Sequence, residues 1–340
     1  MSMKKWFVAL LCVAQIGWVQ GAEAGLISEA DEIQMGAEAA QQLESQYKVS
    51  DDERATAEVM RMVQKLVPYS ERPHLDYSIK VLEEPSINAL AIPGGYLYVF
   101  QGLLDYMPEE HLQAAVIGHE IGHVARKHSV RAIEKQMGIQ LLLSIAVRNR
   151  HEALQNMFMN TVFASHSRGD ERDADVKGFE YTTAAGYNPY SMAMSLNRLG
   201  AIPNQQKANF LSSHPNAIDR IERLKKKMAD QGIRPMVKNE KAGKPQMADG
   251  KWEWPIMSAP NEQGYDSAYR SYAFAGKLSM LDRSGEFDPA KLRISGSSLY
   301  HGDDYLMAFS SEDAAALGIS HQEYLDKMLE ATKNWPRTKK

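Results

Sequence analysis

The sequence is poor in cysteine, in net charge and in repeated segments. Its single cysteine, Cys12, lies near the N-terminus, so the rest of the chain holds neither disulfides nor a thiolate metal site. Leu11 stands where a lipoprotein signal has a small residue, so lipidation of Cys12 is not expected. The 39 lysines and arginines nearly balance the 43 aspartates and glutamates, leaving a net charge of −4. Without a strong basic field, nucleic acid is not an expected partner.

Long apolar runs are absent beyond the N-terminal segment. The longest candidate, 137–147, contains Gln140 and Ser144, and its length is typical of a buried core helix rather than a membrane span. No internal repeat is visible, and in particular no 34-residue helical period. The length of 340 residues allows one large domain or two smaller ones.

The N-terminal segment has the features of a secretory signal peptide. Lys4 and Lys5 precede an apolar stretch at 6–19, and A-E-A at 22–24 matches a small-residue cleavage pattern. We therefore expect cleavage before Gly25 and, in a Gram-negative host, a periplasmic protein. An uncleaved membrane anchor is the alternative interpretation.

Hydrophobic periodicity predicts a mainly helical chain with one short β-rich segment. Alternating apolar residues predict a strand at 75–82, and aromatic and β-branched residues predict another at 96–100, after a Pro93-Gly94-Gly95 turn. Pro108 opens a helix that runs to about 127. Other helices are predicted at 28–67, 130–165, 168–185, 189–199 and 214–230.

The C-terminal third has a different composition. Lysine, glycine, proline and asparagine dominate 232–264, which predicts a linker or extended segment. Ser320 and Glu323 form a capping-box pattern before a terminal amphipathic helix. The predicted organisation is a signal peptide at 1–24, a first domain at 25–230, a linker at 231–264 and a C-terminal region of unknown role at 265–340.

The motif H-E-I-G-H at 119–123 carries the main chemical signal. On a helix, His119 and His123 lie four residues apart on one face, so both imidazoles can reach one metal ion. Glu120 stands beside the first histidine and can take a proton from a zinc-activated water. The neighbouring residues are apolar, and buried polar groups need partners. The alternative is a pair of structural histidines.

A catalytic zinc ion also needs a third protein ligand, and an acidic cluster downstream offers one. Glu171 and Asp175 lie four residues apart on a predicted helix, so one can bind the metal while the other supports a histidine ligand. Spacing alone does not decide between them. Without the histidine motif, this cluster would be interpreted as a solvated helix face.

Five motifs together resemble the gluzincin zinc metallopeptidases grouped with HtpX and the CAAX prenyl proteases. They are H-E-I-G-H-V at 119–124, S-R-G-D-E-R-D-A-D at 167–175, A-G-Y-N-P at 185–189, I-N-A-L-A-I-P-G-G-Y at 87–96 and S-H-P-N-A-I-D-R-I-E-R-L at 213–224. The resemblance covers about 28–228. Because no membrane spans are predicted, the chain is most similar to the soluble periplasmic branch of this family, typified by BepA and LoiP.

The resemblance implies a fold and a ligand set. It implies an α+β fold, in which a mainly helical zincin-type metallopeptidase domain has a small β-sheet and is followed by a C-terminal extension. It assigns one Zn²⁺ per chain to His119, His123 and Glu171, with Asp175 supporting a ligand histidine. Asp173 stands where many members have glutamate, at a position that is not a ligand.

The resemblance also implies a substrate-binding edge strand at about 96–100, along which a peptide backbone would pair. The substrate contacts expected from it are Gly95, Tyr96, Leu97 and Tyr98.

Two residues of the last motif, His214 and Arg220, lie near the metal in relatives, and either could stabilise the oxyanion. For His214 the alternatives are a zinc cap that keeps the enzyme latent and a plain helix N-terminal residue. His128, five residues after His123, should point away from the ligand face and is expected to be structural.

The predicted function is a zinc-dependent endopeptidase in which Glu120 activates a zinc-bound water. Its expected substrates are misfolded or misassembled envelope polypeptides. Outer-membrane assembly proteins are candidate partners, and peripheral association with the outer membrane fits the sequence. A periplasmic chaperone or assembly factor with a latent protease site is the alternative function. A structural zinc protein, with four protein ligands, is the third.

Overall fold

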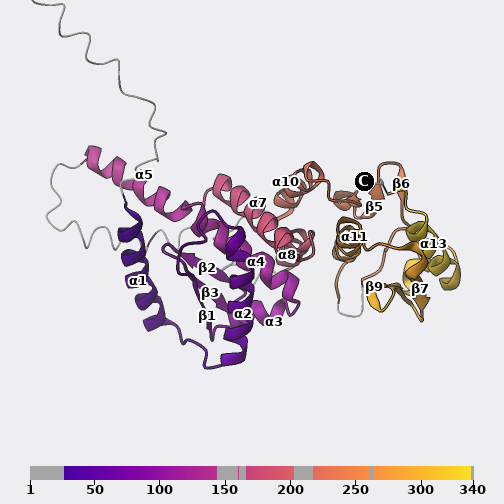
Figure 1. Cartoon of the computed structure of the whole chain (residues 1–340), viewed down its shortest axis with the longest axis horizontal. Coiled ribbons are helices and arrows are strands. Elements are labelled where there is room, and N and C mark those ends of the chain that lie inside the picture. The colour runs from indigo at the N-terminus through magenta and orange to yellow at the C-terminus, as the bar shows by residue number, and fades with distance from the viewer. Residues whose placement is uncertain (1–26, 144–159, 161–165, 203–216, 261–263, 338–340) are drawn as a thin grey trace, which may run out of the picture.

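The computed structural model of the chain describes residues 27–143, 160, 166–202, 217–260 and 264–337. The predicted signal peptide and His214 lie outside these residues. Among the described helices, none is both long and apolar enough to cross a membrane. The elements form an N-terminal group, up to α10, and a C-terminal group that begins with β4 (Figure 1). Helices dominate and the sheets are small, so the predicted α+β fold class is confirmed.

The N-terminal group contains most of the helices. Its helices are α1 (Glu29–Gln46), α2 (Glu53–Leu66), α3 (Gln101–Tyr106), α4 (Glu110–Ala125), α5 (His128–Leu143), α7 (Arg168–Ala184), α8 (Ser191–Gly200) and α10 (Ala217–Asp230), with a 3₁₀ turn at Val67–Tyr69. Its strands are β1 (Ser78–Leu82), β2 (Ala89–Ile92) and β3 (Tyr96–Phe100).

The single helix predicted over 28–67 is interrupted. Between α1 and α2 the chain runs beside β1, where Val49 forms a β-bridge with Leu82 and the Ser50 amide donates to the carbonyl of Val81 at 2.8 Å. Asp52 then caps α2 by accepting from two backbone amides in its first turn. Hydrogen bonds to the strand thus replace helical ones over this segment, which periodicity alone did not reveal.

The first sheet has the strand order β1-β3-β2. β3 pairs in parallel with β1 and in antiparallel with β2, so Tyr96–Phe100 is the central strand. The prediction that it is an edge strand is therefore wrong. The A-L-A-I run before the turn forms a strand of its own, β2, and Gly94 and Gly95 (φ 89° and 102°) let the chain fold back onto β3.

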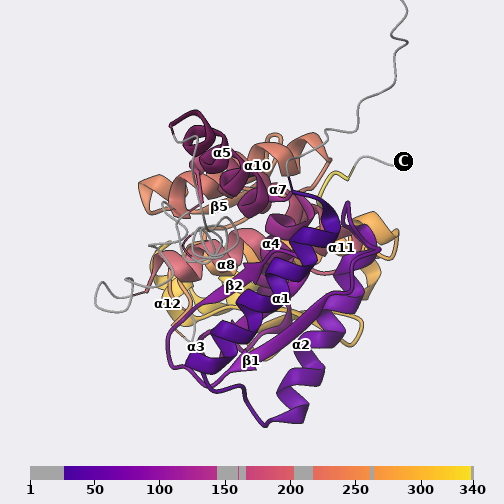
Figure 2. The same cartoon turned by 90° about the vertical axis from the view of Figure 1, so that its left-hand side faces the viewer.

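Helices cover both faces of this sheet. Along β3, Tyr98 and Phe100 pack toward α1, while Leu97 and Val99 pack in the core that includes α2 and α4. α1 crosses one face in Figure 2, and α4 lies against β2 on the other. The sheet therefore places β2 beside the helix that carries the histidine motif.

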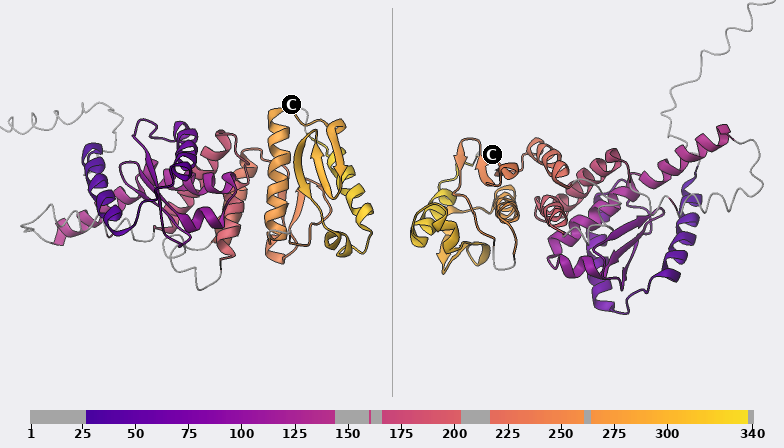
Figure 3. Two further views of the ribbon diagram at one scale, coloured as in Figure 1. Left: turned by 90° about the horizontal axis from the view of Figure 1, so that it is seen from below. Right: turned by 180° about the vertical axis from the view of Figure 1, so that it is seen from behind.

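The C-terminal group forms two small sheets around a long helix. Its strands are β4 (Met236–Lys238), β5 (Gln246–Asp249), β6 (Trp252–Glu253), β7 (Leu292–Ser295), β8 (Ser298–His301) and β9 (Asp304–Ala308). Its helices are α11 (Ser267–Ser284), α12 (Ser311–Ala315) and α13 (His321–Lys333), with 3₁₀ turns at Glu240–Ala242 and Pro289–Lys291. In the left view of Figure 3, α11 (orange) stands between the N-terminal helices and the C-terminal strands.

The segment 231–264, predicted to be a linker or extended segment, is folded and contains three extended strands. Strands β4, β5 and β6 form an antiparallel sheet, and Val237, Met247 and Trp254 are buried in the main apolar core. That core also contains residues of α2, α4, α8 and α13. The predicted terminal helix is confirmed as α13, where the Ser320 hydroxyl accepts from the amide of Glu323.

Candidate metal centre

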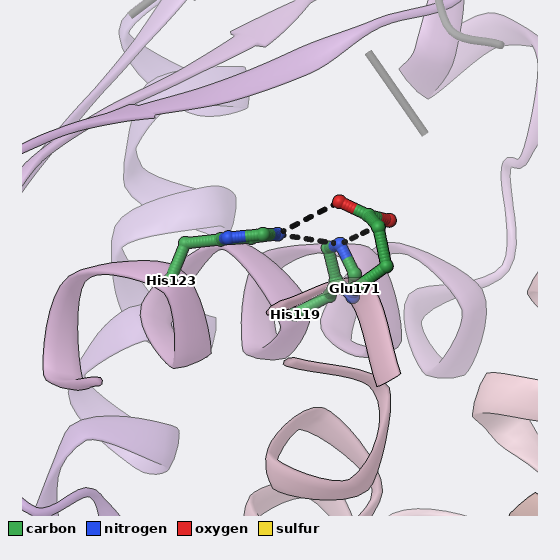
Figure 4. Close-up of side chains that lie close together, drawn as sticks. All are labelled: His119, His123 and Glu171. Atoms are coloured by element: carbon green, nitrogen blue, oxygen red, sulfur yellow. Dashed lines mark hydrogen bonds and ion pairs between the residues drawn. The ribbon is translucent and has the colours of Figure 1, made fainter. Parts of the chain in front are cut away.

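Helices α4 and α7 bring two histidines and a glutamate together. The Nε2 atoms of His119 and His123 lie 3.0 Å apart, and the Glu171 carboxylate lies 3.6 Å from the first and 3.4 Å from the second (Figure 4). All three residues are buried, with at most 3% of their surface exposed.

These separations suit a zinc ion. Zinc bonds of about 2.0–2.1 Å in a tetrahedral site put neighbouring ligand atoms roughly 3.3 Å apart, and the observed 3.0–3.6 Å bracket that value. Two histidines with one glutamate are a catalytic zinc set, which leaves a fourth position open. The three residues can therefore hold one metal ion.

Close helix packing allows this convergence. Gly118 and Gly122 of α4 face Ala174 and Gly178 of α7, and a Cβ atom on either α4 glycine would lie about 3.3 Å from the α7 backbone. Small residues on both helices thus let the backbones approach. Because Ser167 caps α7 by accepting from the Asp170 amide, Glu171 lies in the first turn of a helix with a fixed start.

A second group of charged residues supports the first ligand. His119 Nδ1 lies 3.2 Å from Asp175, whose carboxylate accepts from Arg220 at 2.7 and 2.5 Å. A third guanidinium nitrogen of Arg220 lies 3.1 Å from Glu171. Although burial opposes it, the charge and hydrogen bonds of Arg220 hold the pKa of Asp175 below its usual range.

The two histidines differ electrostatically. Burial disfavours the charged form of His119, but the hydrogen bond to Asp175 and the charge of Glu171 raise the pKa of this ring. Burial, with the nearby ring of His166, lowers the pKa of His123 well below its ordinary value. A neutral imidazole is the form that binds zinc.

Glu120, which directly follows His119 in the sequence, is also buried, with 3% of its surface exposed. Together with Asp175 and Glu171, its charge raises the pKa of Arg220 against the effect of burial. The carboxylate therefore lies close enough to the site to act on its electrostatics.

Several residues predicted for the site lie elsewhere. Tyr96, Leu97 and Tyr98 belong to the central strand, and the Tyr98 hydroxyl donates to Glu44 of α1 at 2.7 Å, on the far face of the sheet. The carbonyl of Gly95 accepts from Ser78 in β1. Instead, Ala91 of β2 lines a small recess together with His123. Arg220 faces the ligand carboxylates, and His214 lies outside the described residues.

Two histidines at the site were not predicted there. The His166 ring stacks on His123 with a centroid separation of 3.9 Å, and His128 Nδ1 lies 2.9 Å from His123 Nδ1. The expectation that His128 points away from the ligands is wrong, because the helix ends before it. His166 immediately precedes the cap of α7, and no sequence signal distinguishes it from a surface histidine.

Comparison with known proteins gives a family match and several relatives. The model of the family "Peptidase family M48" matches residues 53–228. The chain is 30% identical over 154 residues to "Mitochondrial metalloendopeptidase OMA1" of Arabidopsis thaliana, covering 44% of this chain and 31% of that protein. It is 26% identical over 162 residues to "Metalloprotease LoiP" of Escherichia coli, covering 46% and 64%.

A longer match is found with "Beta-barrel assembly-enhancing protease" of Escherichia coli. The identity is 27% over 233 residues, covering 64% of this chain and 47% of that protein. The chain thus spans less than two thirds of the length of each of these curated relatives.

Proposed function

Because the chain belongs to peptidase family M48, we propose that it is a zinc-dependent endopeptidase. The observation that carries the proposal is the buried cluster of His119, His123 and Glu171 at coordination spacing, next to Glu120. Two further features support it: each curated relative named above is a protease by name, and the cluster has the donor set of a catalytic zinc site.

Each residue of the site has a distinct task in peptide hydrolysis. A zinc ion in this cluster supplies Lewis-acid polarisation of the scissile carbonyl and lowers the pKa of water to about 7. The Glu120 carboxylate takes a proton from the attacking water and later passes it to the leaving amine nitrogen as the peptide C–N bond breaks. Asp175 holds the His119 ring in orientation, and Arg220 holds Asp175 and Glu171.

A Glu120→Gln substitution tests this mechanism. The amide keeps the size of the side chain but cannot accept the proton, so cleavage of casein should fall by at least about 100-fold. Zinc content should stay at one ion per chain, since Glu120 is not a ligand in this scheme. The measurement is casein hydrolysis beside zinc content of the purified protein. Full activity in the variant would reject the assignment.

The substrate backbone is proposed to pair with β2 rather than β3. The amide of Phe100 donates to the carbonyl of Asn88, so by antiparallel alternation Leu90 bonds to β3 while Ala89 and Ala91 turn their backbone groups outward. Among the described residues, β2 pairs with no second strand. An extended peptide can add to this edge, and main-chain pairing would give weak sequence selectivity.

An Ala91→Pro substitution tests the edge. It removes an outward amide that the sheet does not use, so kcat/KM for a peptide should fall about five- to tenfold, the effect of one hydrogen bond. The melting temperature should change little. Leu90→Pro is the matched control, because it removes an amide of the β2–β3 ladder and should destabilise the fold. An unchanged kcat/KM in Ala91→Pro would exclude this pairing.

The cellular role is proposed from the N-terminal sequence and the relatives. We infer that residues 1–24 are a signal peptide, that 25–230 form the catalytic domain and that the mature protein works in the periplasm. Misassembled envelope proteins are the proposed substrates, and the relative named for β-barrel assembly suggests outer-membrane assembly proteins as partners. Proteomics of the envelope with wild type and Glu120→Gln should reveal proteins that accumulate only in the variant. Recovery of the chain solely in the cytoplasm would contradict the location.

A further inference from the structure

The helical path of the chain breaks directly after the histidine motif. α4 ends at Ala125, and Lys127 adopts a left-handed conformation with φ 54°. A residue other than glycine rarely adopts this conformation. α5 then begins at His128, so the position of His128 relative to His123 is not that of a continuous helix. This break between the helices places the buried His128 ring against the ring of a proposed zinc ligand.

The contacts of the two ring nitrogens of His123 determine which of them carries the proton. Its Nε2 atom faces His119 and Glu171, so a metal ion in the cluster would bind there. The other nitrogen, Nδ1, then carries the proton and donates it. The acceptor at 2.9 Å is Nδ1 of His128, which must therefore be unprotonated.

The chain of hydrogen bonds continues to α7. With Nδ1 of His128 accepting, its proton resides on Nε2, which lies 3.2 Å from the Asp173 carboxylate. Asp173 also accepts from Arg126 Nε at 2.7 Å. Each donor nitrogen in this series of hydrogen bonds thus faces an acceptor, and the series ends at the ion pair of Asp173 and Arg126.

We propose that His128 is a positioning residue for the metal. It accepts the Nδ1 proton of His123 and, anchored by Asp173 and Arg126, fixes the tautomer and ring orientation that present Nε2 to zinc. This inference rests on the proposed function, because it requires that the cluster binds a metal ion. Each histidine ligand would then be supported by one aspartate of α7 and one arginine. Asp175 and Arg220 support His119. Asp173 and Arg126 support His123 through His128.

Three variants separate positioning from simple packing. His128→Leu fills the space but offers no acceptor, whereas His128→Asn places a carbonyl oxygen near the position of Nδ1. His301→Leu is the matched control, since His301 is also buried and its ring accepts one backbone hydrogen bond, in β8 of the C-terminal group. The zinc dissociation constant of the full-length purified proteins is measured by competition with a chromogenic chelator, without any peptide substrate.

We expect the dissociation constant of His128→Leu to rise about 10- to 100-fold, the effect typical of losing the partner of a zinc-bound histidine. His128→Asn should recover most of this loss, and His301→Leu should bind zinc like wild type. If His128→Leu does not fold, Asp173→Ala replaces it, since it leaves Nε2 of His128 without the Asp173 acceptor and should also weaken zinc binding.

Two results would overturn the inference while leaving the proposed function intact. One is wild-type zinc affinity in His128→Leu or, in its place, Asp173→Ala. The other is an His128→Asn variant as weak as His128→Leu, which would show that the acceptor is not what matters. Absence of zinc binding in the wild-type protein would overturn the inference and the proposed function together.

Discussion

Arg220 connects the carboxylates of the site more closely than any other residue described. Three of its nitrogen atoms face Asp175 and Glu171 at 2.5–3.1 Å, and only 4% of its surface is exposed. A guanidinium held this way is not directed at a reacting carbonyl. Its contacts favour a positioning role over the predicted role in stabilising an oxyanion.

An Arg220→Lys substitution distinguishes the two roles. Lysine keeps a positive charge but cannot make the two-pronged contact with Asp175, so we expect a loss of about 1–3 kcal/mol in the free energy of unfolding and weaker zinc binding. Loss of an oxyanion donor would instead leave zinc binding unchanged and lower kcat about 100- to 1,000-fold. Zinc titration, thermal unfolding and kcat at saturating zinc separate these outcomes.

Among the individual residues of the site, those of the histidine motif were the most predictable from the sequence. Helical spacing alone indicates that His119 and His123 share a face, and the structure brings them together. The choice between Glu171 and Asp175 could not be made by spacing, because residues four apart on a helix also share a face. It depends on which imidazole nitrogen each carboxylate meets: Glu171 faces Nε2, and Asp175 faces Nδ1.

Among the elements, the contact between α4 and α7 decides whether the ligands can meet. Gly178 lies at the closest approach: a Cβ atom there would lie 2.9 Å from the His119 amide nitrogen and 2.4 Å from the end of the Met192 side chain. Met192 can move, but the backbone of α4 cannot move without moving its histidines. Glu171 lies two turns earlier on α7, so any displacement of that helix shifts a ligand.

A Gly178→Ala substitution should therefore affect both stability and metal binding. We expect a loss of about 1–3 kcal/mol from overpacking and a rise in the zinc dissociation constant on the order of tenfold. Gly169→Ala on the same helix is the control, because its Cβ atom would meet nothing closer than 3.5 Å. This variant should leave stability and zinc affinity nearly unchanged. Thermal unfolding and chelator competition measure the two effects. Equal zinc affinity in both variants would show that the helix spacing does not control the site.

The elements themselves were predictable where their pattern is local. Aromatic and β-branched residues mark β3, and proline with early acids marks α4. The position of β3 within the sheet was not predictable, since strand order depends on pairing between distant segments. Likewise, the left-handed conformation of Lys127 breaks the helix without a glycine or proline, so a helical wheel continued past Ala125 placed His128 on the wrong side of α4.

At the scale of the whole molecule, the C-terminal group is attached to the metallopeptidase part by a polar and aromatic contact. Tyr190 stacks on Tyr272 and donates to the carbonyl of Pro235 at 2.9 Å, and the Tyr265 hydroxyl donates to Glu109, which precedes α4. The apolar core continues across this contact. The group is therefore part of one folded body rather than a tethered appendage.

The composition of 231–264 could not reveal this attachment. Lysine, glycine and proline correctly predict turns in this segment, and Gly243 and Gly250 do adopt left-handed conformations between the strands. The few apolar residues of the segment, such as Val237 and Met247, are too sparse to give a period. Their burial depends on α11, a helix that follows later in the chain, and so it is decided by tertiary packing.

Gly276 of α11 gives a direct test of the attachment, because a Cβ atom there would lie 1.7 Å from Oδ1 of Asn188. Asn188 is buried, accepts from the Tyr190 amide at 2.8 Å and donates to the carbonyl of Ala273 at 3.3 Å. In Gly276→Ala it must move and lose these bonds, at about 1 kcal/mol each. We expect the free energy of unfolding to fall by about 2–3 kcal/mol.

The same variant should become sensitive to limited proteolysis between the two groups, while its zinc affinity stays close to that of wild type, because α4 and α7 carry the ligands. Gly169→Ala serves again as the matched substitution, and since alanine favours helix it should not destabilise the protein. The expected result would be contradicted if Gly276→Ala had the wild-type free energy of unfolding and the wild-type resistance to protease. In that case α11 does not depend on Asn188 for its position, and the C-terminal group is held by its apolar contacts alone.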